Sequence, residues 1–295
     1  MNYSLIRRFR MCWVPDVEGK DGLAGELSHP GKMPDMPVRY VGWLSRFAGR
    51  AAGAGQGGGR AASAGPGTGP WGLEGGRGDN VDLLILLSGP EPQRTLLERR
   101  LLDQMADYSG RVVLVRGLPA GAPATGVSAT LPEGPTGASP RVNLPQRVRV
   151  YDHLPADELE ELIRGAGQII CRSGYSTVMD LVRLGRRAIM VPTPGQTEQE
   201  YLGNYLAARG WAVCIDQKGF SLMDALAAAK GEWGEQGAGE GREMDIPGVR
   251  QLPDPAAGEG LLRQAVAEVL AMVRRELDAA REPEADREPG VSREP

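Results

Sequence analysis

The chain has 295 residues and a formal net charge of −4, and glycine and proline are concentrated in a few stretches. This charge argues against a nucleic-acid-binding protein, which normally presents a basic face to the phosphate backbone. The sequence contains only three cysteines, Cys12, Cys171 and Cys214, and only two histidines, His29 and His153. We therefore expect neither a disulfide framework nor a zinc site.

The amino-terminal third of the chain contains no targeting or spanning signal. Its first stretch, MNYSLIRRFRMCWV, lacks the long apolar core and the small-residue cleavage site of a secretory signal, and no run of about twenty apolar residues follows. We expect a cytoplasmic protein, either free or peripheral to the inner face of a membrane. Residues 49–80 are rich in glycine and alanine and have little to bury, so they predict a flexible insertion.

From residue 81 onward, short apolar runs alternate with amphipathic stretches, which is typical of βαβ units around a parallel sheet. Strands are predicted at 81–88, 111–117, 148–154, 168–173, 187–193 and 212–216. Helices are predicted at 92–108, 156–166, 176–185, 197–210 and 221–229. The predicted fold class is therefore α/β, with helices on both faces of a parallel sheet.

Glycines mark the ends of three predicted helices. Gly110, Gly185 and Gly210 each follow a helical pattern, where a left-handed cap without a Cβ is favoured. Beyond the sheet, residues 231–258 predict a loop and residues 259–281 a last amphipathic helix. The charged, proline-bearing residues 282–295 then predict a disordered tail.

Three polar turns follow predicted strands. They are SGPEPQR (Ser88–Arg94), RSGYST (Arg172–Thr177) and PTPGQTEQE (Pro192–Glu200). In open parallel sheets, ligands bind beyond the carboxyl ends of the strands, where helix N-termini offer unpaired N–H groups. If adjacent strands carry these turns, the turns line one crevice.

The turn RSGYST has the residue types of a phosphate-binding turn. Gly174 would let the backbone approach an anion closely, and Ser176 or Thr177 could cap the following helix while donating to phosphate. Asp180, one turn later, is placed to accept from a ribose or sugar hydroxyl. The alternative is an ordinary junction between a strand and a helix, with a Ser/Thr cap and a solvated Asp180, and the residues alone leave both interpretations open.

The other two turns are less specific. Gln199 and Glu200 fall in the first turn of a predicted helix and could hold sugar hydroxyls, although an acid there also suits the helix dipole without any ligand. Pro90 and Pro92 remove two N–H donors from the first turn, which leaves Arg94 as its candidate phosphate contact.

Catalytic residues are not identifiable from the sequence. His153 and Tyr151 end the third predicted strand, where each could contact a nucleobase or be structural, and His153 could also act as a base. No Ser-His-Asp arrangement and no convincing pair of carboxylates accompany them.

The segment IICRSGYSTVMDLVRLGRRAIMVPTPGQTEQEYLGNYLAARGWAV (Ile169–Val213) resembles the carboxyl-terminal domain of family 28 glycosyltransferases. Within that family it is most similar to the peptidoglycan enzymes that move N-acetylglucosamine from UDP onto a lipid-linked acceptor. The shared pattern is an Arg-Ser-Gly turn leading through Thr to an acid, then a Pro turn and a Gln-rich helix start. The resemblance implies a Rossmann-like nucleotide-sugar-binding domain over residues 81–230, the carboxyl-terminal half of a GT-B fold.

The resemblance also implies roles for individual residues. Ser173, Gly174 and Thr177 would face the diphosphate, and Asp180, in the place of the family's Glu, would bind the ribose. Gln199, with Glu200, would hold the donor sugar. The complete predicted UDP-sugar site, which includes no metal or cofactor, is Gly89, Arg94, Tyr151, Arg172, Ser173, Gly174, Ser176, Thr177, Asp180, Gln199 and Glu200.

Two further assignments follow from the same resemblance. Val150 and Tyr151 fall where the family's backbone contacts uracil. Gly89 falls in the family's first glycine loop, but this chain has Ser-Gly-Pro where the family has Gly-Gly-Ser. Residues 1–48 resemble the connection between the two GT-B domains, with a dedicated amino-terminal extension as the alternative. We expect the amino-terminal domain, which in the family supplies the acceptor site and general base, to be missing.

The expected function is therefore that of a glycosyltransferase donor domain, which binds UDP-N-acetylglucosamine or a similar UDP-sugar for hexosyl transfer. Its expected partner is a separate acceptor-binding subunit associated with a membrane. Two alternatives remain open: a non-catalytic nucleotide-sugar-binding subunit or truncated remnant, and a UDP-sugar epimerase or hydrolase of the same architecture.

Overall fold

The structure, a computed structural model, describes residues 9–19, 22–47, 81–118, 144–234, 253–254, 256 and 258–281. The predicted insertion at 49–80, the tail at 282–295 and most of the predicted loop at 231–258 lie outside the described residues.

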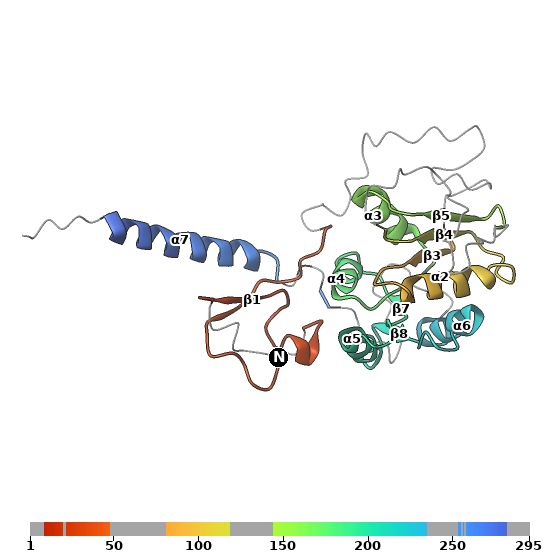
Figure 1. Ribbon diagram of the computed structural model, residues 1–295, viewed down its shortest axis with the longest axis horizontal. Coiled ribbons are helices and arrows are strands. Elements are labelled where there is room, and N and C mark those ends of the chain that lie inside the picture. Colours follow the sequence, from red (N-terminus) through yellow and green to blue (C-terminus); the bar gives the residue numbers. More distant parts are fainter. Residues whose placement is uncertain are drawn as a thin grey trace, which may run out of the picture.

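A six-stranded parallel sheet forms the core of the larger body, at the right of Figure 1. Its strands are β3 (Leu83–Leu86), β4 (Val112–Val115), β5 (Val148–Tyr151), β6 (Gln168–Cys171), β7 (Ala188–Met190) and β8 (Ala212–Cys214). They lie in the order β5-β4-β3-β6-β7-β8, and each neighbouring pair is parallel. The six predicted strands are confirmed, and each is shorter than its predicted range.

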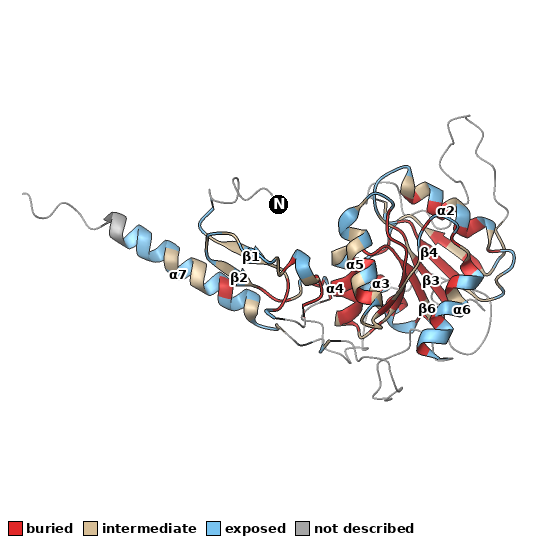
Figure 2. Ribbon diagram, turned by 90° about the horizontal axis from the view of Figure 1, so that it is seen from below, coloured by how far each residue is buried: buried red, intermediate tan, exposed pale blue. Residues whose placement is uncertain are grey.

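Helices cover both faces of this sheet. They are α2 (Gln93–Asp103), α3 (Ala156–Gly165), α4 (Tyr175–Arg183), α5 (Thr197–Ala207) and α6 (Leu222–Trp233). Because successive strand residues point to opposite faces, Leu83 and Ile85 pack with residues of α2 and α6, whereas Leu84 packs with residues of α3 and α4. Figure 2 shows the buried strands between these helices. The predicted α/β class with helices on both faces is confirmed.

Helix α2 ends earlier than predicted. It stops at Asp103 instead of continuing to residue 108. The next residue, Gln104, uses its side chain to accept from Leu222 N (2.6 Å) and to donate to Phe220 O (3.3 Å), so it connects α2 to the start of α6. Gly110 accordingly caps no helix and does not have a positive φ, in contrast to Gly185 and Gly210 (φ 64° and 68°).

Helix α6 continues beyond its predicted end at residue 229. The added turn carries Trp233, which is 1 % exposed and belongs to the same core cluster as Phe220 and Ala229. Burial of this aromatic side chain favours the helical conformation over the predicted loop because it removes a large apolar surface from water.

Residues 9–47 form a small unit that packs against the sheet domain. Strands β1 (Cys12–Val14) and β2 (Val38–Tyr40) pair in parallel, and the short 3₁₀ helix η1 (Gly25–Leu27) lies between them in the chain. The Asp16 side chain, which is fully buried, organises this unit. Its carboxylate accepts five hydrogen bonds, from Val17 N, Leu23 N, Ala24 N, Ser28 Oγ and Trp43 Nε1.

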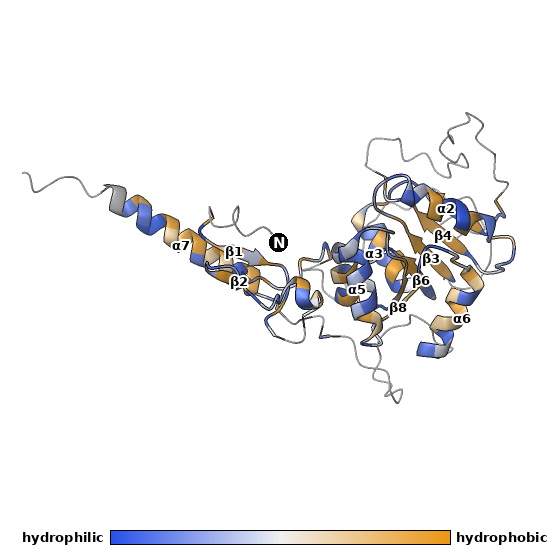
Figure 3. Cartoon of the chain, turned by 60° about the horizontal axis from the view of Figure 1, so that its bottom comes forward, coloured by the Kyte–Doolittle hydropathy of each residue, from blue (hydrophilic) through white to orange (hydrophobic). Residues whose placement is uncertain are grey.

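Helix α7 (Leu261–Arg281) confirms the predicted last helix and lies beside β2 (Figure 2). Arg39 Nε donates to Glu268 Oε2 at 3.0 Å and joins β2 to this helix. In Figure 3, hydrophobic and hydrophilic residues alternate along the length of α7. Its apolar side chains Leu270 and Leu277 are more than half exposed. Among the described helices, α7 included, none is both long enough and apolar enough to span a membrane.

Candidate functional site

The three polar turns lie at one edge of the sheet. They follow β3, β6 and β7, which are neighbours in the strand order. The chain leaves β3 in one direction to build β4 and β5, and then returns to the other side of β3 to build β6, β7 and β8. In open α/β sheets, ligands bind at such a reversal, beyond the carboxyl ends of the two central strands. We call this edge of the sheet, between β3 and β6, the crevice. The expectation that adjacent strands carry the turns is confirmed.

The first and third turns approach each other closely. A Cβ added to Gly89 would lie 3.3 Å from Thr193 Oγ1, and Gly89 has a φ of 99°, which glycine adopts most readily. The Thr193 hydroxyl is buried and has no hydrogen-bond partner among the described residues. Gly89 therefore borders the crevice directly.

The N-terminus of α4 is open. Gly174 is its N-cap residue (φ −70°, ψ 138°), no side chain caps it, and nothing lies within 4 Å of a Cβ added to Gly174. The first N–H groups of a helix have no partner within the helix, and they carry a partial positive charge. The prediction that Ser176 or Thr177 caps the helix is wrong, because the helix begins at Tyr175 and both residues lie inside its first turn.

Arg172 connects the ends of three elements from a buried position. It is 1 % exposed, and its guanidinium donates to Val191 O (3.0 Å), Pro192 O (3.2 Å) and Gln93 O (2.9 Å). Burial lowers the pKa of Arg172 to about 10, so the side chain stays cationic at neutral pH. No carboxylate of the described residues forms an ion pair with it. Arg172 thus places an unbalanced positive charge beside the crevice.

Ser173, Gln199 and Glu200 are brought together around the third turn. Ser173 Oγ donates to Gln199 O at 2.7 Å, and Gln199 Oε1 accepts from Thr193 N at 3.0 Å. Glu200 Oε1 accepts from Gly195 N at 2.8 Å. These bonds hold the turn after β7 against the turn after β6, so the three side chains already have partners within the protein.

Arg94 lies in the interior. It is 5 % exposed, and its guanidinium is paired with Glu98 (Nη1–Oε2 3.1 Å) and with Glu91. A phosphate contact would require Arg94 to leave these carboxylates, so the structure does not bring it to the open side of the crevice.

Asp180 is buried, in contrast to the solvated aspartate of the alternative interpretation. It is 4 % exposed. Its Oδ1 accepts from Ser45 Oγ (2.8 Å) and Arg46 N (3.1 Å), and its Oδ2 lies 2.7 Å from Arg46 Nε. Sequence reasoning missed Ser45 and Arg46 as partners of this site, since no local signal relates residues so far apart in the chain.

Tyrosine hydroxyls attach residues 9–47 to α4 and α5. Tyr175 Oη donates to Pro15 O (2.7 Å), Tyr205 Oη donates to Gly22 O (3.0 Å), and Tyr201 Oη accepts from Glu26 N (2.8 Å). Burial, followed by the charge of Asp16, raises the pKa of Tyr175. The amino-terminal unit therefore docks on the two helices that begin at the crevice.

Tyr151 ends β5, which is separated from β3 by β4. Its side chain is half-buried, burial raises its pKa, and its carbonyl accepts from Arg116 N at 2.8 Å. His153 follows two residues later and is exposed. The predicted uracil end of the site is thus at the other side of the β3 turn from α4.

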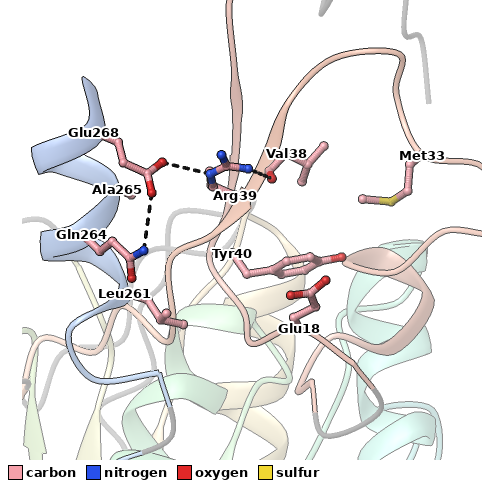
Figure 4. A pocket seen from close by; sticks show the side chains of 9 residues that line it. All are labelled: Glu18, Met33, Val38, Arg39, Tyr40, Leu261, Gln264, Ala265 and Glu268. Atoms are coloured by element: carbon pink, nitrogen blue, oxygen red, sulfur yellow. Dashed lines mark hydrogen bonds and ion pairs between the residues drawn. The ribbon is translucent and has the colours of Figure 1, made fainter. Parts of the chain in front are cut away.

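A pocket of about 530 Å³ lies between β2 and α7, away from these turns (Figure 4). Its lining residues are Glu18, Met33, Val38, Arg39, Tyr40, Leu261, Gln264, Ala265 and Glu268. None of them was predicted as a site residue. Within the part of the chain that the structure describes, no cluster of His, Cys, Asp and Glu could hold a metal ion.

Residues 142–230 match the glycosyltransferase family 28 C-terminal domain. The chain is 39 % identical over 80 residues to the UDP-N-acetylglucosamine--N-acetylmuramyl-(pentapeptide) pyrophosphoryl-undecaprenol N-acetylglucosamine transferase of Desulforudis audaxviator, covering 26 % of this chain and 21 % of that protein. It is 33 % identical over 111 residues to the Rhodopseudomonas palustris enzyme of the same name, covering 30 % of each. The chain thus spans less than a third of these relatives.

Two solved structures align with parts of this chain. The glycotransferase of kitacinnamycin aligns with a TM-score of 0.47 at 16 % identity, over 92 % of this chain and 56 % of that one. MurG of Acinetobacter baumannii aligns with a TM-score of 0.36 at 18 % identity, over 50 % of this chain and 40 % of that one.

Proposed function

We propose that this chain is the donor-binding part of a glycosyltransferase and that it binds a UDP-sugar, UDP-N-acetylglucosamine or a close analogue, at the crevice between β3 and β6. The observation that carries the proposal is the open N-terminus of α4 at the reversal point of a family 28 domain. The family match supports the sugar-nucleotide class, and the two curated relatives are named as UDP-N-acetylglucosamine transferases.

In this proposal the diphosphate lies at the start of α4. The N–H groups of Ser176 and Thr177 donate to it, and the helix dipole and the buried Arg172 cation stabilise its negative charge. The same groups stabilise the UDP leaving group as the glycosidic bond to the diphosphate breaks, because charge on the leaving oxygen increases in that step. Gln199 and Glu200, at the start of α5, contact the donor sugar, which is attached to the diphosphate.

Hexosyl transfer also requires an acceptor site and a general base, and we propose that an acceptor-binding unit outside the described residues supplies both. The relatives are named for transfer to a pyrophosphoryl-undecaprenol. A lipid-linked acceptor of this kind would place the protein at the inner face of a membrane, as a peripheral protein.

Donor binding can be tested by calorimetric titration with UDP and UDP-N-acetylglucosamine. A Gly174→Val variant adds methyl groups where the protein leaves open space, so we expect it to fold normally and to lose at least tenfold in affinity for both ligands. Gly165→Val, at the end of α3, is the matched control, because a Cβ there also meets nothing within 4 Å. Equal affinity of Gly174→Val and wild-type protein would contradict the proposed site.

A further inference from the structure

A buried carboxylate joins α2 to the end of β4. Glu98 is fully buried, and its two oxygens accept from Arg94 Nη1 (3.1 Å) and Arg116 Nε (2.7 Å). Arg116, which directly follows β4, is 4 % exposed. A carboxylate in the interior persists as an anion only when such charged partners surround it. The two arginines therefore fix Glu98, and Glu98 in turn fixes the Arg116 guanidinium.

Arg116 extends this network to the turn after β5. Its Nη1 donates to Asp152 Oδ1 at 2.8 Å, and its backbone N–H donates to Tyr151 O at 2.8 Å. Leu118 N donates to Asp152 O at 2.9 Å. Although burial alone would lower the pKa of Arg116, its bonds to Asp152 and Glu98 outweigh burial and raise it. Three bonds thus hold Tyr151 and Asp152 in one position.

The segment that carries these donors is itself held against the end of β3. Gly117 has a φ of 67°, and a Cβ on it would lie 2.4 Å from Leu87 O. This close backbone approach leaves the segment little freedom to shift. The network consequently sets the distance between the end of β5 and the turn that contains Gly89.

We infer that Glu98, Arg116 and Asp152 are positioning residues that fix Val150 and Tyr151 for recognition of the donor's base, and that they thereby determine the preference for uracil. This inference rests on the proposed function and on the family resemblance, which implies that Val150 and Tyr151 face uracil. Recognition of one base by backbone groups needs those groups to stay within about 0.5 Å of their bonding positions.

The test separates the two ends of the nucleotide. Uridine and inorganic diphosphate are titrated separately into wild-type protein and into Asp152→Ala, which removes the oxygen that accepts from Arg116 Nη1. The Asp152 side chain is 21 % exposed, so we expect this variant to fold. We expect uridine affinity to fall at least tenfold and diphosphate affinity to change less than twofold, because only the base end moves.

Two further variants complete the experiment. Glu160→Gln removes the carboxylate that pairs with Arg164 within α3, outside this network and the three turns, so it should change neither affinity. Arg116→Lys keeps the charge, but a lysine ammonium cannot bond to Glu98 and Asp152 together. We therefore expect this variant to have a lower ratio of UDP affinity to ADP affinity than wild-type protein.

Each outcome bears on a different claim. Unchanged uridine affinity in Asp152→Ala, or an equal fall for uridine and diphosphate, would overturn the positioning role. Wild-type protein that binds neither probe would instead refute the proposed function, and this inference with it.

Discussion

Arg46 and Asp180 form an ion pair, with 2.7 Å between Arg46 Nε and Asp180 Oδ2, although the residues are 134 positions apart in the chain. The Asp180 side chain is 5 % exposed and that of Arg46 is 49 % exposed. The carboxylate predicted to bind ribose is therefore also the anchor of residues 44–47 on α4. A ribose at this place must share Asp180 with Arg46 or displace it.

This double role predicts a large loss of stability on substitution of Asp180. In Asp180→Ala, the Ser45 hydroxyl and the Arg46 N–H lose their acceptor in a buried place, so we expect the free energy of unfolding to fall by about 2–4 kcal/mol. Urea denaturation measures this change. Arg46→Ala removes a half-exposed partner and should cost less than half as much. Equal stability of Asp180→Ala and wild-type protein would show that residues 44–47 do not depend on this carboxylate.

Two helical glycines should respond oppositely to alanine. A Cβ on Gly203 in α5 would lie 2.7 Å from Cys214 Sγ and 3.0 Å from Pro192 Cγ, so Gly203→Ala should destabilise the protein by about 1–3 kcal/mol. Gly231 in α6 is exposed and has nothing within 4 Å of an added Cβ. Gly231→Ala should therefore stabilise the protein by about 0.5–1 kcal/mol. Thermal unfolding of both variants checks the pair, and a more stable Gly203→Ala protein would refute the packing around α5.

The protein should lose stability in alkali. Burial raises the pKa of Cys171 to about 12 and, with the charge of Asp216, that of Cys214 to about 11. Since both groups release their protons at lower pH when the chain is unfolded, their contribution is complete below about pH 8.5 and is lost as pH rises through 11 to 12. Unfolding in urea at pH 8 and pH 10.5 measures the loss. In a Cys171→Ala, Cys214→Ala variant the loss should be smaller, and an identical pH dependence would exclude these thiols as its cause.

The sheet was predictable because its strands are short apolar runs between polar turns, and each run carries its own signal. That the three turns lie close together could be predicted only on the condition that neighbouring strands carry them, because no local stretch of sequence specifies the strand order. The cap of α4 was mispredicted because Ser176 and Thr177 resemble cap residues, while Gly174 occupies that position without a side chain. The end of α6 was missed because burial of Trp233 depends on the tertiary structure.

The interior network and the docking of residues 9–47 could not be read from sequence for a related reason. Glu98 and Arg116 look like solvated charges in their local sequence, and only the packing of α2 on β4 buries them together. Asp180 likewise looked like a solvated or ligand-binding acid, and its anchor residues come from a distant segment. The roles of the predicted UDP-sugar residues remain predictions, and the structure adds their positions.

The most direct test of nucleotide-sugar binding at α4 is amide hydrogen exchange with and without saturating UDP-N-acetylglucosamine. The account predicts slower exchange at Ser176 and Thr177, whose N–H groups would bind the diphosphate. It also predicts unchanged exchange around the pocket between Tyr40 and Gln264. Protection confined to that pocket, or none at the start of α4, would contradict the central claim.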